Sequence, residues 1–255
     1  MLKKRGFLSY DPAEDTYTIN WHETLSILVG TRLLEELLAA RGYIKGRLLD
    51  VGCGKRPYSL IYDSLVTESF GTEVTFSPHG TDAADLISYA ETLPFESHSF
   101  DTILCTEVLE HTRQPFQVLE EFARILKPNG HLLLSVPFIY PIHEAPHDYW
   151  RFTTHGLQSL CESVELTPLY VHAKGGIGAT SLSLALLLIV RVLNAFSKVF
   201  NLSPPLREWK SIGWLLYALQ QSYLWLAKTL PTPFWQAYIG SWMTPGYVLV
   251  ARKSA

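Results

Sequence analysis

The sequence has few of the residues that mark secreted or nucleic-acid-binding proteins. Its 255 residues include three cysteines, Cys53, Cys105 and Cys161, which are far apart and form no C-x-x-C pair. An odd number of isolated cysteines argues against a disulfide framework and favours a reducing compartment. The net charge is −3 without a block of like charge, so we expect no nucleic-acid partner. No apolar run follows the basic N-terminus, so we predict no signal peptide and a cytoplasmic location.

Apolar residues, in contrast, are plentiful. They make up 47% of the chain, which supports a sizeable core in one α/β domain with an insertion. Short apolar runs alternate with amphipathic segments, a pattern that predicts a mostly parallel sheet covered by helices on both faces. Strands are expected at 47–51, 69–74, 85–89, 100–106, 131–137, 167–173 and 246–252, and helices at 20–41, from about 57, at 115–127 and at 155–164.

Charge is unevenly distributed, and the change in composition indicates domain boundaries. Five of the seven tryptophans lie between Gly175 and Ala251, where charged residues are sparse: Arg191, Lys198, Arg207, Glu208, Lys210 and Lys228. We therefore expect three parts: an N-terminal helical cap at 1–45, a core formed by 46–175 with 244–255, and an apolar helical insertion at 176–243.

The apolar insertion is predicted to contain two helices, at 181–200 and 211–228. Arg191 interrupts the first after about ten apolar residues, short of the roughly 20 that a membrane span needs. Three roles stay open for the pair. It could pack on the sheet or form a homodimer, it could associate peripherally with a membrane through its positive charge and tryptophans, or it could form a hydrophobic acceptor pocket.

The stretch HEAPHDYWRFT at 143–153 contains an H-E-x-x-H pattern, which on a helix binds zinc in metalloproteases. Here Pro146 precedes the second histidine, and proline inside a helix costs roughly 3 kcal/mol. We therefore expect an extended loop instead of a protease helix. The loop is either a site or a salt-bridged lid, and it brings together His143, Glu144, His147, Asp148, Tyr149 and Arg151.

A glycine turn follows the first strand of the predicted core, at Gly52 and Gly54. Pro57 stands where a dinucleotide fingerprint needs its third glycine, so a nicotinamide cofactor is disfavoured, and no Walker loop is present. Glu73 ends the next strand, where a carboxylate can bind both hydroxyls of a ribose. The ligand should be a nucleoside whose compact tail tolerates the acidic Asp50, and S-adenosylmethionine fits this description.

Three ordered blocks carry a family resemblance: LLDVGCG at 48–54, LPFESHSFDTILCTEVLEH at 93–111 and LKPNGHLLLSVPF at 126–138. Together they resemble the class I S-adenosylmethionine-dependent methyltransferases of the methyltransferase-11 type, over about residues 46–137. The stretch from Pro137 to Thr153 is similar to a subgroup with a PHDYxRxT signature. The resemblance implies a Rossmann-like, doubly wound, mostly parallel seven-stranded sheet, with the apolar helical insertion placed before the last strand.

The same resemblance implies roles for particular residues. Asp50 and the glycine turn, Gly52-Cys53-Gly54, would hold the methionine half of the cofactor, and Glu73 its ribose. Thr106 and Glu107 would face the methyl group. Tyr89 and Ala90 would flank the adenine, although many relatives have aspartate where this chain has Tyr89, so stacking or backbone contacts would replace that hydrogen bond. Cys53 and Cys105 are also expected to be small buried residues.

The chemistry expected is in-line methyl transfer to a small-molecule, glycan or lipid-linked acceptor, for which the protein supplies positioning and, where needed, a base. The candidate catalytic residues are His147, Asp148, His143, Tyr149 and His111, and Arg151 could hold an acidic acceptor group. His111 could instead only pack beneath the next loop. No metal is expected, although His143, His147 and Asp148 could together hold one. The alternative function is a non-catalytic scaffold that binds S-adenosylmethionine.

Overall fold

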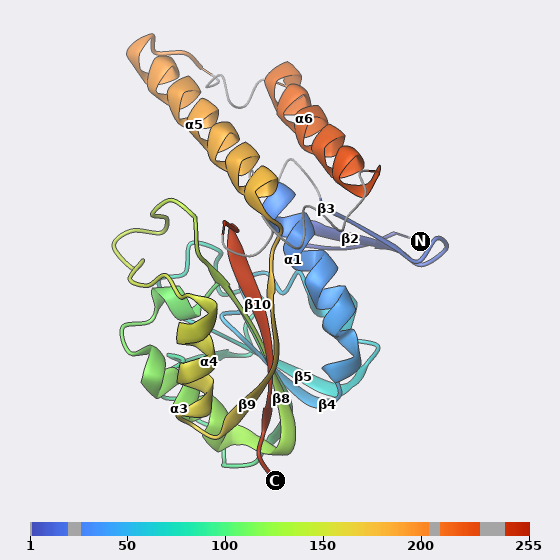
Figure 1. Cartoon of the computed structure of the whole chain (residues 1–255), viewed down its shortest axis with the longest axis vertical. Helices are drawn as coiled ribbons and strands as arrows, with labels where there is room; N and C mark the ends of the chain where they lie inside the picture. The colour runs from blue at the N-terminus through green and yellow to red at the C-terminus, as the bar shows by residue number, and fades with distance from the viewer. Residues whose placement is uncertain (1, 20–26, 204–209, 230–242) are drawn as a thin grey trace.

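The computed structural model describes residues 2–19, 27–203, 210–229 and 243–255. A seven-stranded sheet with the order β6-β5-β4-β7-β8-β10-β9 forms its centre (Figure 1). Neighbouring strands from β6 to β8 run parallel, and β10 runs antiparallel to β8 and β9. The predicted Rossmann-like, mostly parallel sheet of seven strands is thus confirmed. The strands are β4 (Gly46–Val51), β5 (Val66–Glu73), β6 (Leu86–Ile87), β7 (Phe100–Thr106), β8 (Leu126–Pro137), β9 (Leu166–Ala173) and β10 (Gly246–Lys253).

Helices cover both faces of this sheet, because the buried strands present apolar side chains in both directions. One core cluster lies beneath α3 (Pro115–Ile125) and α4 (Thr154–Glu162). The other lies beneath α1 (Ile27–Ala39), the 3-10 helix η1 (Ala40–Tyr43) and α2 (Ser59–Tyr62). Because neighbouring strands from β6 to β8 run parallel, their carboxyl ends lie at a common edge of the sheet. The glycine turn and the end of β7 are at that edge.

The N-terminal part differs from the expected helical cap. Residues 3–19 form a separate antiparallel sheet of β1 (Lys3–Arg5), β2 (Leu8–Asp11) and β3 (Thr16–Ile19). The turn residues Gly6 and Asp15 have positive φ, which suits tight connections between short strands. Helix α1 follows as predicted, although the expected start at residue 20 lies outside the described residues.

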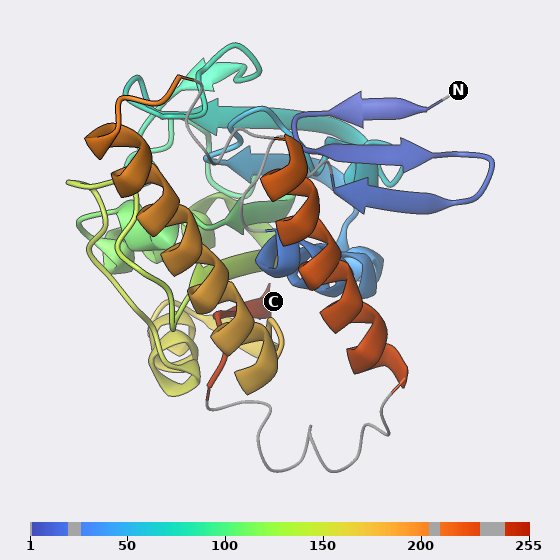
Figure 2. The ribbon, with the colours of Figure 1, turned by 90° about the horizontal axis from the view of Figure 1, so that it is seen from above.

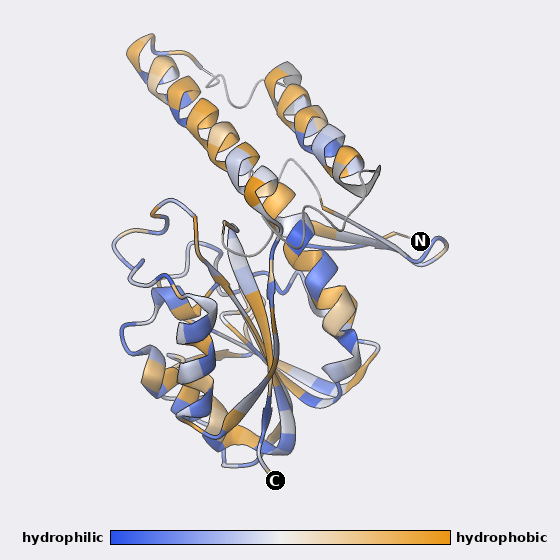
Figure 3. Cartoon of the chain, in the orientation of Figure 1, coloured by the Kyte–Doolittle hydropathy of each residue, from blue (hydrophilic) through white to orange (hydrophobic). Residues whose placement is uncertain are grey.

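Two long helices, α5 (Ile177–Val199) and α6 (Lys210–Thr229), extend away from the sheet as an arm (Figures 1 and 2). Both are dominated by apolar residues (Figure 3). The arm joins the core through α1, where Leu28, Ala179 and Leu224 form a buried cluster and Gln220 Oε1 accepts a hydrogen bond from the Leu28 amide at 2.8 Å. The apolar helices before the last strand agree with the predicted insertion, part of which, 204–209 and 230–242, lies outside the described residues.

Two smaller differences concern element lengths. The helix expected from residue 57 is a single turn, α2, and the helix expected to reach 127 ends at Ile125. Strand β8 begins at once at Leu126 and runs through Pro128-Asn129-Gly130, where Asn129 adopts φ 62°. Turn residues that predicted a break instead lie within an irregular strand, because β8 pairs with β7 on one side through a register shift.

Candidate functional site

The glycine turn leaves β4 in a conformation that only glycine adopts readily. Gly52 has φ 66° and Gly54 has φ 52°. A side chain on Gly52 would collide with Val108, so the turn lies directly against the segment that follows β7. Cys53, between the two glycines, is buried, and burial raises the pKa of its thiol to about 12. The sequence therefore located the turn correctly, and the Cys53 side chain fills space beneath it.

Glu73, at the end of β5, is tied to this turn. Its Oε2 accepts a hydrogen bond from the Gly54 amide at 2.8 Å, and its Oε1 accepts one from the Val74 amide at 2.9 Å. The side chain is 7% exposed. The expected convergence of Glu73 on the glycine turn is thus present, and the carboxylate is held in one orientation by two backbone donors.

Asp50 lies beneath the turn rather than on it. It is 2% exposed, and its Oδ2 accepts a hydrogen bond from Tyr62 Oη at 2.9 Å. Burial raises the pKa of this carboxyl to about 7, although the Tyr62 hydrogen bond and Arg56 act against the shift. The contact with Tyr62 fixes the Asp50 carboxyl beneath the turn, and its predicted role in holding the methionine half of the cofactor stays a prediction.

The end of β7 brings Thr106 and Glu107 to the same edge of the sheet. Glu107 has φ 55°, and its Oε1 accepts hydrogen bonds from Ser135 Oγ at 2.7 Å and from Lys174 Nζ at 2.6 Å. Lys174 is completely buried at the end of β9. No local pattern indicated Lys174, because only the fold reveals that this lysine reaches a carboxylate 67 positions away.

Tyr89 and Ala90 follow β6 on the neighbouring loop. Ala90 is buried in the core, whereas Tyr89 is 56% exposed. The Tyr89 ring lies 6.2 Å from the ring of Phe76, which is itself 4.6 Å from the ring of His147. The rings of Tyr89, Phe76 and His147 thus form a row, called the aromatic rim below, between the glycine turn at 52–54 and the HEAPHD loop at 143–148.

The HEAPHD loop contains no helix, so the geometry of a zinc protease does not form, as predicted from Pro146. Asp148 anchors the loop: its two oxygens accept hydrogen bonds from Arg151 at 2.6 and 2.8 Å, and Oδ2 also accepts one from the His143 amide. Burial alone would raise the pKa of Asp148, but Arg151 and the His143 amide lower it to about 2. Asp148 is therefore a fixed anion paired with Arg151.

The predicted partnership of Asp148 with His147 is not formed. His147 Nδ1 lies 3.1 Å from Tyr149 Oη, while the histidine next to Asp148 is His143, with Nδ1 3.2 Å from Oδ2. Arg151 occupies the Asp148 oxygens in a bidentate pair, which leaves the His147 ring to pack on Phe76.

His111 packs beneath the same loop, with Nδ1 2.6 Å from the His147 carbonyl oxygen. Its neighbour Glu110, within the 3-10 helix η2 (Leu109–His111), is completely buried. Burial, followed by the nearby Glu107, raises the pKa of Glu110 well above its usual value. The sequence placed His111 among the candidates but overlooked Glu110, whose position in E-V-L-E-H was visible while its burial was not.

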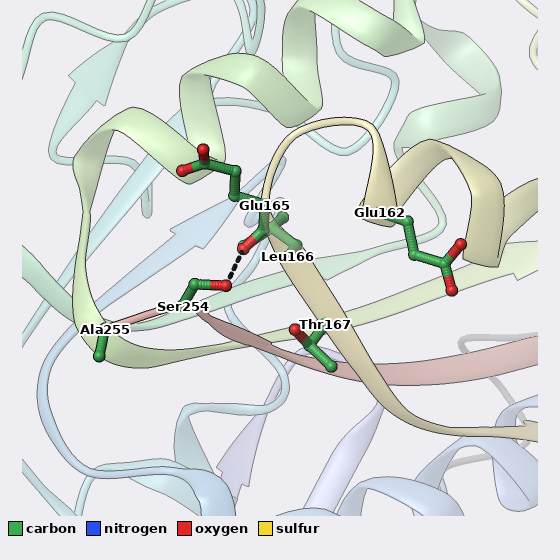
Figure 4. Close-up of a pocket in the computed structure, with 6 residues that line it drawn as sticks. All are labelled: Glu162, Glu165, Leu166, Thr167, Ser254 and Ala255. Carbon is green, nitrogen blue, oxygen red and sulfur yellow. Dashed lines mark hydrogen bonds between the residues drawn. The ribbon is translucent and has the colours of Figure 1, made fainter.

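A separate surface hollow lies where the turn between α4 and β9 meets the residues that follow β10 (Figure 4). Ser254 Oγ there donates a hydrogen bond to the Glu165 carbonyl oxygen at 3.2 Å. The hollow contains none of the predicted site residues, and it is lined by Glu162, Glu165, Leu166, Thr167, Ser254 and Ala255.

Known proteins match the part of the chain that holds the glycine turn. The methyltransferase-11 family model, described as a methyltransferase domain, matches residues 49–134. Residues 49–134 of this chain form a methyltransferase domain that is similar to the class I S-adenosylmethionine-dependent methyltransferases. The matched segment contains the turn, Glu73, Tyr89, Ala90, Thr106, Glu107 and most of strand β8, which is the region where the sequence blocks predicted it.

Among curated proteins, the methyltransferase domain resembles ubiquinone biosynthesis O-methyltransferases. The Vibrio cholerae protein is 29% identical over 123 residues, which cover 41% of this chain and 47% of that protein. The Xanthomonas oryzae pv. oryzae protein is 35% identical over 105 residues, covering 35% and 42%. The chain thus spans about half the length of the curated relatives it matches.

Solved structures share the methyltransferase fold at low sequence identity. Phosphoethanolamine N-methyltransferase 2 of Haemonchus contortus, in complex with S-adenosyl-L-methionine, has a TM-score of 0.52 at 14% identity, covering 87% of this chain and 53% of that one. The cyclase SpnF has a TM-score of 0.53 at 18% identity, covering 88% and 81%. The two have different reactions, so the fold alone does not determine the chemistry.

Proposed function

We propose that the whole protein is an S-adenosylmethionine-dependent methyltransferase that acts on a small, apolar or lipid-linked acceptor at a membrane surface. The pairing of Glu73 with the glycine turn carries the cofactor part of this proposal. Glu73 has lone pairs beyond those that accept from Gly54 and Val74, and these can accept hydrogen bonds from ribose hydroxyls. The methionine half of the cofactor would then lie against Gly52 and Gly54, near the β7 end.

The adenine is proposed to lie on the aromatic rim. Tyr89 and Phe76 are exposed and adjacent, and flat rings stack favourably on a purine. This arrangement replaces the hydrogen bond that an aspartate at position 89 would make. Ala90, the next residue in the chain, is buried and is proposed to flank the adenine.

Methyl transfer requires an acceptor atom in line with the carbon–sulfur bond of the cofactor. The acceptor atom attacks the methyl carbon, the carbon–sulfur bond breaks, and S-adenosylhomocysteine leaves. Thr106 and Glu107 lie at the sheet edge where this carbon would be held. His147 and Tyr149, linked at 3.1 Å, are proposed as the acceptor-side pair, with His147 as base, while Asp148 and Arg151 keep the loop in place.

The α5–α6 arm supports an apolar or lipid-linked acceptor. The relatives named for ubiquinone biosynthesis O-methylation favour a small-molecule acceptor, and the arm exposes large apolar side chains. Helix α5 is long and apolar enough to cross a membrane by length and composition, and only 28% of its apolar window is buried. Arg191 and Lys198 on α5 favour an anionic surface. Large apolar side chains that are exposed on the two helices include Leu188, Val192, Val199, Trp214 and Trp225.

Sedimentation with vesicles of anionic phospholipid tests the membrane part. The protein should pellet with the vesicles, and Trp214→Ser combined with Trp225→Ser should leave most of it in the supernatant. Phe116→Ser is the matched control, because Phe116 is 57% exposed on α3, away from the arm. A protein that stays in the supernatant, or one whose arm is covered in a homodimer, would contradict membrane docking.

Turnover distinguishes an enzyme from a scaffold. Labelled S-adenosylmethionine and a membrane-lipid extract should give a labelled extractable product and S-adenosylhomocysteine. Cofactor binding without any labelled product from small-molecule, glycan or lipid extracts would favour the non-catalytic scaffold.

A further inference from the structure

Three side chains from two distant segments converge next to the β7 end. Glu110 and His111 belong to η2, and His143 belongs to the HEAPHD loop. Glu110 Oε1 lies 3.6 Å from His111 Nε2 and 3.8 Å from His143 Nε2. One ligand atom from each residue lies within 4.8 Å of the other two. The three groups therefore face a common point.

The histidine contacts determine which ring nitrogens face this point. His111 Nδ1 is 2.6 Å from a carbonyl oxygen, which can only accept, so the proton is on Nδ1 and Nε2 carries a lone pair. His143 Nδ1 is 3.2 Å from Asp148 Oδ2 but makes no hydrogen bond in the described part of the chain, so the negative charge of Asp148, rather than a hydrogen bond, favours a proton on Nδ1. Carboxylate and carbonyl partners of this kind orient metal-binding histidines through the nitrogen that does not bind the metal.

The burial of Glu110 is a further, independent indication that this cluster binds a ligand. Glu110 is completely buried, and in the described part of the chain neither carboxylate oxygen makes a hydrogen bond. The nearest cations are already engaged, because Arg151 donates to Asp148 and Lys174 donates to Glu107. A buried carboxylate facing two imidazole lone pairs is unfavourable unless a cation or proton lies between them.

We propose that Glu110, His111 and His143 bind a divalent transition-metal ion. Bonds of about 2.1 Å place neighbouring ligand atoms roughly 3–4 Å apart. The distances from Glu110 Oε1 to the two histidine nitrogens, 3.6 and 3.8 Å, lie in this range. Two imidazoles with carboxylate suit zinc or a neighbouring metal better than calcium or magnesium. Glu144 borders the cluster without belonging to it: its Oε2 lies 3.8 Å from His111 Nε2, and its Oε1 lies 3.2 Å from His79 Nε2.

The proposed site departs from the sequence-based expectation of no metal, and it differs from the H-E-x-x-H motif in the loop. His143 and Glu144 are the first two letters of H-E-x-x-H, whereas His147 contributes its carbonyl to His111 instead of its ring. A bound ion would take an oxygen of the acceptor and lower the pKa of that hydroxyl, so that the oxygen could attack the methyl carbon. That role rests on the proposed function, whereas metal binding does not.

Calorimetric titration of Zn²⁺ into chelator-treated full-length protein tests the site. We expect one ion per chain, with affinity at least about tenfold weaker in Glu110→Gln and in His143→Ala, since each loses one ligand. His172→Ala is the matched control, because His172 pairs with Glu36 on the surface of β9 and should bind zinc as the wild type does. The visible spectrum of the Co²⁺-loaded protein should report nitrogen and oxygen ligation without relying on activity.

Stoichiometric binding by the wild type that is at least about tenfold weaker in both variants, each still folded by circular dichroism, supports the site. Absence of tight binding by folded wild-type protein, or equal binding by the variants and His172→Ala, overturns it. A parallel titration with S-adenosylhomocysteine separates the proposals. Cofactor binding without metal binding rejects only the metal site, and metal binding without cofactor binding rejects only the proposed function.

Discussion

The buried carboxyl of Asp50 gives the clearest prediction of how folding stability depends on pH. Its folded pKa is about 7, above the unfolded value near 3.9, so the folded state holds the proton more tightly. Stability is therefore lost as pH rises from the unfolded pKa through the folded one, and the destabilisation is complete above about pH 7.

Substitution of Asp50 by asparagine should remove this dependence, because the amide oxygen still accepts from Tyr62 but does not titrate. Relative to Asp50→Asn, the wild type should lose about 2 kcal/mol of unfolding free energy between about pH 5.5 and about pH 8. Urea denaturation of both proteins at the two pH values measures this difference. Parallel pH profiles would show that Asp50 is already ionised in the folded protein.

Gly52 makes a steric prediction. Gly52→Ala places a side chain at φ 66° and against Val108, at a cost of about 1–2 kcal/mol for the backbone alone. Thermal unfolding and S-adenosylhomocysteine titration should both report the loss, as a lowered Tm and weaker binding. Gly42→Ala is the control, since no heavy atom lies within 4 Å of its added carbon. Equal behaviour of the two variants would mean that the turn is not strained as described.

The site residues fall into two groups, according to whether the neighbouring sequence indicates their position. The positions of Gly52, Gly54 and Glu73 could be predicted, because turn geometry and strand ends leave signals within a few positions. Lys174 and Glu110 could not, since their importance comes from complete burial next to groups supplied by other segments. The predicted pairing of Asp148 with His147 was wrong for the same reason, because Asp148 pairs with Arg151 and lies next to His143.

At the scale of elements, α4 begins with a cap that can be tested. Thr153 Oγ1 accepts a hydrogen bond from the Gly156 amide at 3.0 Å. Thr153→Ala should reduce the free energy of unfolding by about 1 kcal/mol, because that amide loses its partner. Thr153→Ser keeps the hydroxyl and should stay close to wild type in urea denaturation. A loss that is equal in both variants would assign the effect to the methyl group instead of the cap.

The buried strands were predicted closely because each is an apolar run bounded by turn residues, as in β7 (FDTILCT) and β10. The N-terminal sheet was missed because β1 is fully exposed and β3 alternates between exposed and half-buried positions. Short exposed strands have no apolar run to identify them. The ends of α2 and α3 depend on packing, which the local sequence does not contain.

In the whole molecule, the order of the strands determines where a ligand can bind. The parallel strands from β6 to β8 end at one edge, and the glycine turn, Glu73, Glu107 and the HEAPHD loop are brought there by that topology. The division into an N-terminal part, a core and the α5–α6 arm stays a prediction. Binding of the cofactor at the shared edge is the central claim, since the acceptor, membrane and metal-dependent chemistry proposed above all assume it.

Titration of S-adenosylhomocysteine into the purified protein by calorimetry tests this claim most directly. Wild type should bind one molecule per chain, and Glu73→Ala should bind at least about tenfold more weakly, because a charged hydrogen-bond acceptor is worth about 1.5–3 kcal/mol. Glu68→Ala is the matched control on the same strand, where Glu68 pairs with Arg47 at 3.1 Å on the surface. Absence of binding by folded wild type, or equal binding by the Glu73 and Glu68 variants, would contradict the account.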